Sequence, residues 1–186
     1  MEKEFNAGFT LTGIIKATLA TIQTKAQWDL HKEIERRVKV GLPFMDLVKR
    51  LNQMCRIEVV ANQVNLDPKV GRTMIMNNLT NTSPTNTLRI NYGALGTGTT
   101  APADGDTAME TETYRKLVSS QTNSTNVGYV SMFYAATDCN GTYKEVGLFS
   151  DGEAGSGTGI LVVHSAVNIT KSAIQTLTID HVLTLS

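Results

Sequence analysis

Apolar residues in the first part of the chain recur at the spacing of a helix. One stripe at the 3.6-residue period consists of Ile15, Leu19, Ile22, Ala26, Leu30, Ile34 and Val38. Gly41 ends this pattern, and Pro43 suits the first turn of a second helix, where its missing N–H costs nothing. The apolar face of that second helix consists of Phe44, Leu47, Val48 and Leu51. Such helices must pack against the rest of the chain or against a neighbouring copy.

From Arg56 onward the pattern changes to short runs rich in β-branched residues, which are typical of strands. These runs cover residues 56–66, 87–95, 127–137, 142–150, 159–169 and 176–186. The last run alternates, and its apolar face consists of Leu177, Ile179, His181, Leu183 and Leu185. Turn dipeptides such as Asn140-Gly141 and Asp151-Gly152 favour antiparallel pairing of consecutive strands.

Two short helices are expected between these strands. Asp67-Pro68 opens the first, over residues 69–81. Its apolar side consists of Val70, Met74, Ile75 and Leu79. Thr107 and Glu110 have the T-x-x-E spacing of a capping box, which predicts a second helix that continues to Leu117.

The predicted fold class is α+β: an antiparallel β-sandwich domain over residues 56–186 with two short inserted helices, preceded by an N-terminal helical docking segment over residues 1–55. A chain of 186 residues, 41% of them apolar, can bury a core of this size. The formal net charge is zero, but residues 1–72 carry +4 and residues 73–186 carry −4. A charge of +4 is too weak to indicate nucleic-acid binding, and no apolar run reaches the length of a membrane helix. Neither a nucleic acid nor a membrane is therefore expected as a partner.

A segment at residues 91–117, NYGALGTGTTAPADGDTAMETETYRKL, places Gly96 and Gly98 in the G-x-G-x-x-A pattern of a loose dinucleotide-binding fingerprint. In such a site a helix begins at the glycines, so that its first amides meet the phosphates. Here Pro102 and an acidic stretch intervene, and the expected helix begins only near residue 107. We therefore expect the glycines to form a turn that serves the fold, with no cofactor bound.

Acidic residues in the same segment raise the alternative of a cation site: Asp104, Asp106, Glu110 and Glu112. Their spacing differs from that of an EF-hand loop, and the dipole of a helix favours acids in its first turn without any cation. His31 lies in a charged helical stretch and is expected to be solvated. His164 and His181 lie in predicted strands, and His181 is expected in the core with one hydrogen-bond partner. Because two histidines without a third ligand do not make a zinc site, no metal is expected.

Residue patterns of known catalysts are not found, neither G-x-S-x-G nor a cysteine in a histidine context. Cys55 and Cys139 are expected to be reduced, buried thiols. Aromatic residues gather in neighbouring predicted strands: Tyr129, Phe133, Tyr134, Tyr143 and Phe149. They are expected in the core rather than on a stacking platform, because no basic residues interleave with the first cluster. The sequence predicts no enzyme and no catalytic, cofactor-binding or metal-binding residues.

The segment at residues 91–117 resembles a recurring segment of tailed-bacteriophage virion structural proteins: a strand, A-L-G-T-G-T-T-A-P, a D-T and then E-x-x-R on a helix. Upstream, VGRTMIMNNL resembles the helix that precedes this segment in such proteins. Downstream, NGTYKEVG resembles part of their strand–turn–strand, and the closing TKSAIQTLTI resembles their terminal strand. The resemblance covers residues 56–186 and leaves residues 1–55 outside it.

This resemblance implies a non-enzymatic virion protein of the neck or tail region, such as a collar, tail or fibre-attachment component. It would be made in the bacterial host cytoplasm and would assemble as a symmetric homo-oligomer with portal, neck or tail proteins. Arg115 of E-x-x-R is expected to pair with nearby carboxylates. Two alternatives stay open. One is a capsid decoration protein, and the other is a module that binds host carbohydrate or protein through the aromatic strands or the loops at 81–87 and 151–158.

Overall fold

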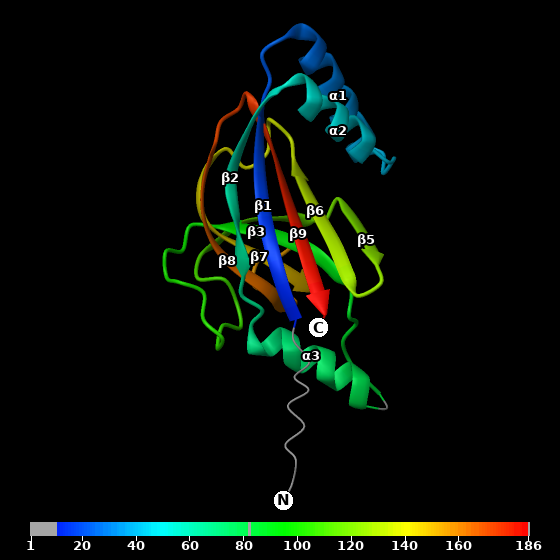
Figure 1. The fold of residues 1–186 in the computed structure, drawn as a ribbon, viewed down its shortest axis with the longest axis vertical. Coiled ribbons are helices and arrows are strands. Elements are labelled where there is room, and N and C mark those ends of the chain that lie inside the picture. Colours follow the sequence, from blue (N-terminus) through cyan, green and yellow to red (C-terminus); the bar gives the residue numbers. More distant parts are fainter. Residues whose placement is uncertain (1–10, 82, 186) are drawn as a thin grey trace, which may run out of the picture.

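The computed structural model describes residues 11–81 and 83–185, which form three helices and nine strands in two antiparallel sheets (Figure 1). The predicted α+β class with a β-sandwich is confirmed. Sheet A contains, in spatial order, β2 (Arg56–Asn65), β1 (Leu11–Thr21), β9 (Gln175–Leu185), β6 (Val127–Tyr134) and β5 (Ser120–Ser124). Sheet B contains β4 (Glu112–Leu117), β3 (Ile90–Gly96), β7 (Gly141–Ser150) and β8 (Ile160–Lys171).

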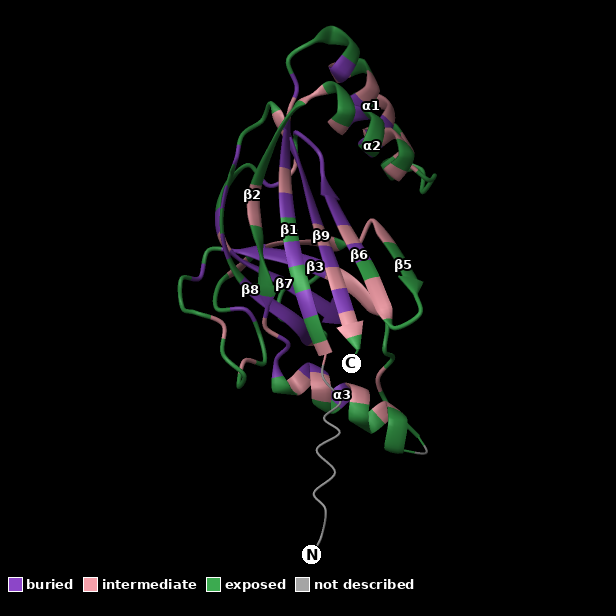
Figure 2. Cartoon of the chain, viewed as in Figure 1, coloured by how far each residue is buried: buried purple, intermediate pink, exposed green. Residues whose placement is uncertain are grey.

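The main core lies between the two sheets, where strands direct alternate side chains inward (Figure 2). The buried inward face of β9 consists of Leu177, Ile179, His181 and Leu183. This is the face that the sequence predicts, except that Leu185 is exposed at the end of the strand. The inward face of β1 consists of Ile15, Ala17 and Leu19.

The helix predicted at the start of the stripe is wrong, because residues 11–21 form strand β1. Ile15 and Leu19 are four residues apart, a spacing that fits one face of a helix and also one face of a strand. β1 pairs with β9 on one edge and with β2 on the other, and this long-range pairing decides between the two. Residues from both sides of the expected boundary at residue 55 thus build one sheet.

The capping-box helix expected from Thr107 is also wrong. Residues 112–117 form β4, which pairs with an edge of β3 that would otherwise expose its backbone groups. The Glu110 carboxylate accepts hydrogen bonds from the backbone N–H (2.8 Å) and hydroxyl (2.9 Å) of Thr100 instead of capping a helix. One inserted helix, α3, is therefore present in the described part of the sandwich rather than two.

Two helices between β1 and β2, α1 (Lys25–Lys39) and α2 (Met45–Met54), confirm the predicted helical pair. Thr24 and Gln27 form a capping box at the start of α1, in which each side chain accepts from the other residue's backbone N–H. Gly41 ends α1 with a φ of +68°, a conformation that glycine adopts without steric cost. Pro43 lies two residues before α2 and not in its first turn.

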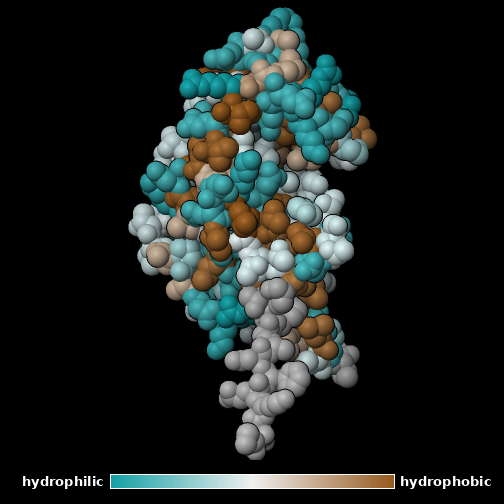
Figure 3. Space-filling view, in the orientation of Figure 1, coloured by the Kyte–Doolittle hydropathy of each residue, from teal (hydrophilic) through white to brown (hydrophobic). Residues whose placement is uncertain are grey.

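The α1–α2 hairpin packs on the outer face of sheet A, near the C-terminal end of β6. Its buried residues Ile34, Val48 and Leu51 cluster with Phe133, which points away from the main core. The rest of this outer face is not covered by a helix, and apolar side chains lie across it (Figure 3).

α3 (Lys69–Thr80) lies at the opposite end of the sandwich from the hairpin (Figure 1). Pro68 immediately precedes it, as predicted. Gly71 lets α3 approach β8, because a Cβ at this position would lie 2.9 Å from Val162 Cα. Near this end the two sheets meet, since Leu66 and His164 form an isolated antiparallel bridge with N–O distances of 3.0 and 2.9 Å.

Candidate functional site

The glycine segment does enclose an anion, and that anion is a carboxylate of the chain itself. Glu145 lies on β7, directly opposite Gly96 at the end of β3. Its buried carboxylate accepts hydrogen bonds from the backbone N–H groups of Thr111 (2.7 Å), Gly98 (3.0 Å) and Glu110 (3.0 Å). The amides that a phosphate would need are therefore occupied by Glu145.

The two glycines are required by this close approach. A Cβ at Gly96 would lie 2.4 Å from Glu145 Oε1 and 2.5 Å from the Thr111 carbonyl oxygen. A Cβ at Gly98 would lie 2.6 Å from the same carboxylate oxygen and 2.5 Å from Glu110 Cβ. The G-x-G pattern thus serves backbone packing around an internal carboxylate, which is a role in the fold.

His164 on β8 extends this cluster. Its Nε2 lies 3.0 Å from Glu145 Oε2, and its Nδ1 lies 2.8 Å from Asp106 Oδ2. Burial acts to raise the pKa of Asp106, but the hydrogen bonds from the Ala103 N–H and from His164 leave that pKa below its usual value. A histidine can act as a base for a nucleophile only if one nitrogen faces that nucleophile. Here both nitrogens of His164 face carboxylates.

The other acids of the segment also have protein partners. Asp104 pairs with Arg72 (2.6 Å), and Glu112 pairs with Arg115 (2.6 Å). Within residues 11–81 and 83–185, no group of three or more His, Cys, Asp and Glu side chains is arranged to hold a metal ion. The acids that suggested a cation site are brought near the glycine loop, but each is bound to a different group.

Arg115 connects the segment to the 151–158 loop. Its guanidinium forms two hydrogen bonds to the Glu112 carboxylate (2.6 and 2.7 Å) and donates to the Thr158 carbonyl oxygen (2.8 Å). It also stacks 4.1 Å from the ring centre of Phe149. The side chains of Arg115 and Glu112 are only 3% and 7% exposed, so E-x-x-R forms a buried ion pair.

The prediction that His31 is solvated is wrong, because α1 turns this side chain toward the sandwich. His31 is 1% exposed, and its Nε2 accepts a hydrogen bond from the Ala136 N–H (2.9 Å). Burial lowers the pKa of His31, although the nearby Glu35 carboxylate opposes that shift. The ring fastens the hairpin to the end of β6.

His181 is buried in the core as predicted, but it lacks the expected hydrogen-bond partner. Neither ring nitrogen has a partner among the described residues. Ile15 and Val130 lie directly opposite it on the two neighbouring strands. Burial alone lowers the pKa of His181 to about 3. His164 and His181 lie in different sheets, so their strands do not pair.

His181→Leu is expected to remove a pH dependence of stability. Since the pKa of His181 is about 3 in the folded chain and 6.5 otherwise, the unfolded chain binds protons more readily as the pH falls below 6.5. Stability should therefore decrease toward acid, by up to about 1.4 kcal/mol per pH unit. Burial raises the pKa of Asp67 to about 6, so this residue makes stability increase as the pH falls from 6 to 4. This contribution is the same in wild type and in His181→Leu.

Urea denaturation of wild type and His181→Leu at pH 7.5 and pH 4.5 measures this effect. The free energy of unfolding of the variant, relative to that of wild type, should be about 2–3 kcal/mol higher at pH 4.5 than at pH 7.5. If the two proteins differ in free energy of unfolding by the same amount at both pH values, His181 takes up its proton while the chain stays folded.

Most of the aromatic residues lie in the core, as predicted: Phe133, Tyr134, Tyr143 and Phe149 are buried. Tyr129 is 43% exposed, so one ring of the five is available at the surface. A stacking platform needs several neighbouring rings, and this arrangement does not supply them. Cys139 is buried as expected, whereas Cys55 is only half-buried; both thiols are free.

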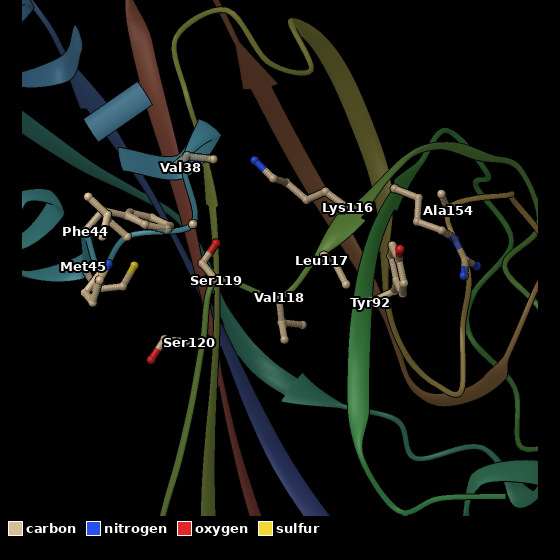
Figure 4. A pocket seen from close by; sticks show the side chains of 14 residues that line it. Val38, Phe44, Met45, Tyr92, Lys116, Leu117, Val118, Ser119, Ser120 and Ala154 are labelled. Carbon is tan, nitrogen blue, oxygen red and sulfur yellow. The ribbon is translucent and has the colours of Figure 1, made fainter. Parts of the chain in front are cut away.

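An open groove of about 830 Å³ separates the tip of the α1–α2 hairpin from β4 (Figure 4). One side is lined by Val38, Phe44 and Met45, and the other by Tyr92, Lys116 and Leu117. The Lys116 amine donates to the Phe133 carbonyl oxygen (3.0 Å) and pairs with Asp138 (3.0 Å). The groove therefore offers mainly apolar contact surface.

Sequence reasoning missed Glu145 and Lys171, two buried charged residues that bind loops of the sandwich. Lys171 donates to the carbonyl oxygens of Ala136 and Asp138 and to the side-chain oxygen of Asn140. One signal was present for Glu145: it lies between Tyr143 and Gly147 on the same side of an apolar strand. The backbone amides that it accepts from lie 34 to 47 residues away in sequence, and His164 lies 19 residues away, beyond any local pattern.

No protein-family model, curated protein or solved structure matches this chain. In the part of the chain that the structure describes, no helix is both long and apolar enough to cross a membrane.

Proposed function

We propose that this chain is a non-enzymatic structural component of a tailed-phage virion, located in the neck or tail region. There it assembles as a symmetric homo-oligomer together with portal, neck or tail proteins. It is made in the host cytoplasm and acts through surfaces, without a cofactor or a metal.

One observation carries this proposal: the residues that resemble phage virion proteins bind one another. Gly98 and Thr111 of the glycine segment bind Glu145 of NGTYKEVG, and the E-x-x-R residues Glu112 and Arg115 bind each other. The resemblance therefore concerns a network that holds the sandwich together. A scaffold shared in this way supports a shared structural role better than a shared reaction.

The α1–α2 hairpin supports the docking part of the proposal. Residues 25–54 contain seven basic and four acidic residues. Exposed basic side chains include Lys32, Arg36, Lys39, Lys49 and Arg50. Since the hairpin lies outside the resemblance and projects from one end of the sandwich (Figure 1), it can determine the position in the particle by contact with an acidic partner.

The number of copies per particle tests the location. Quantitative mass spectrometry of purified particles should give about a dozen copies, as for a ring at the neck or tail. Hundreds of copies would replace the neck assignment with a capsid decoration protein. Particles without the protein would contradict the virion proposal altogether.

A further inference from the structure

The open part of the outer face of sheet A carries an apolar row that crosses four strands in register. The register pairs Val64 with Ile14, Ile14 with Val182, and Val182 with Tyr129. Val64 is 74% exposed, Ile14 50% and Tyr129 43%, and Val182 between them is half-buried. Figure 3 shows apolar side chains across the middle of this face. Direct neighbours of this kind form one patch rather than scattered exposed residues.

The next row toward the hairpin is polar and contains opposite charges. It consists of Asn62, Lys16, Asp180 and Ser131, again paired directly across β2, β1, β9 and β6. Lys16 and Asp180 lie opposite each other on the two central strands. The row is therefore neutral overall, with the cation Lys16 on β1 and the anion Asp180 on β9.

We infer that a second copy of this chain covers this face, related by a two-fold axis parallel to the strands between β1 and β9. This rotation exchanges β1 with β9 and β2 with β6. It places Ile14 over the partner's Val182 and Val64 over the partner's Tyr129. It also places Lys16 over the partner's Asp180, so both rows are self-complementary, as a two-fold interface requires.

The hairpin fits the same arrangement. A third row consists of Val59, Thr18, Thr178 and Phe133, and the hairpin covers its Phe133 end. The rotation brings the partner's hairpin over the other end, where Val59 is 50% exposed. A helix adds its own thickness of about 10 Å between the two sheets, so the faces diverge toward the hairpin end and come closest at the Ile14 row.

The size of the face suits a stable pair of copies. Strands of 11 residues span about 35 Å, and four strands side by side span about 20 Å. The whole outer face, one end of which the hairpin covers, therefore measures about 700 Å², which is close to the roughly 800 Å² per partner of a standard interface. This inference rests on the self-association part of the proposed function and names the surface that carries it.

Light scattering coupled to size-exclusion chromatography of the full chain tests the inference. Wild type should have an even multiple of the 20.2 kDa chain mass, with a pair as its smallest unit. Val64→Lys should raise the dissociation constant of that pair at least about 100-fold. Leu79→Lys, at an exposed apolar site on α3, is the matched control and should leave the mass unchanged.

Charge variants test the geometry of the pair. Lys16→Asp and Asp180→Lys should each separate the copies, whereas the double variant should restore the wild-type mass, because it exchanges the two charges. A thermal melt of each variant separates this result from unfolding.

Each other outcome has a distinct meaning. A wild-type oligomer that Val64→Lys leaves intact would overturn this surface and leave self-association standing. If wild type is a monomer at every concentration, both this surface and self-association are overturned. The copy-number test would then still decide whether the protein is present in particles.

Discussion

Glu145→Ala is expected to lower the free energy of unfolding by about 3–5 kcal/mol. The substitution removes a buried carboxylate and leaves three backbone N–H groups, those of Gly98, Glu110 and Thr111, without their acceptor. It also leaves His164 Nε2 without its partner. Since the loop that contains these amides connects β3 to β4, we expect the whole edge of sheet B to loosen.

Urea denaturation at neutral pH measures this loss. Glu145→Gln should lose less than Glu145→Ala, because one amide oxygen still accepts part of the network. Glu153→Gln, on the exposed 151–158 loop, is the matched control and should not change the midpoint measurably. A loss below about 1 kcal/mol for Glu145→Ala would mean that the glycine segment is held by something else.

Arg115→Met is expected to lower the free energy of unfolding by about 3–5 kcal/mol, because it leaves the Glu112 carboxylate buried without a partner. Chemical denaturation of a double variant separates pairing from packing. Adding Glu112→Gln to Arg115→Met should recover part of the loss, since the unpaired charge is then gone.

The chain provides its own control for this pair. Glu33 and Arg36 on α1 have the same E-x-x-R spacing and a similar separation (2.7 Å against 2.6 Å), but their side chains are 36% and 58% exposed. Arg36→Met should therefore have little effect on stability. Equal losses for Arg115→Met and Arg36→Met would contradict the structural role given to the buried pair.

Strand positions in the second half of the chain could be predicted from sequence because alternation and turn residues agree there. The run at 176–186 is an example: Leu177, Ile179 and Leu183 share a face, and all three are buried. The same reasoning failed for β1 and β4. In β1 the four-residue spacing of Ile15 and Leu19 fits both a helix and a strand, and only pairing with β9, at the other end of the chain, distinguishes them.

The candidate site was predicted only in outline. The sequence predicted a turn at the glycines, and this is wrong, because Gly96 ends strand β3 and both glycines serve the fold by close packing around Glu145. No local feature identified Glu145 as the group that they surround. Burial of His31 depends in the same way on contact with Ala136, 105 residues away. Contacts of this range are set by the packing of the sheets and the hairpin, which a single sequence does not specify.

Immunogold electron microscopy tests the central claim most directly. An antibody raised against the purified protein is applied to particles from a lysate of the culture that produces it, with preimmune serum as the control. The virion proposal predicts gold at the neck or tail of the particles. The absence of gold from every particle, with the epitope shown to be accessible on purified protein added to the same grid, would contradict it.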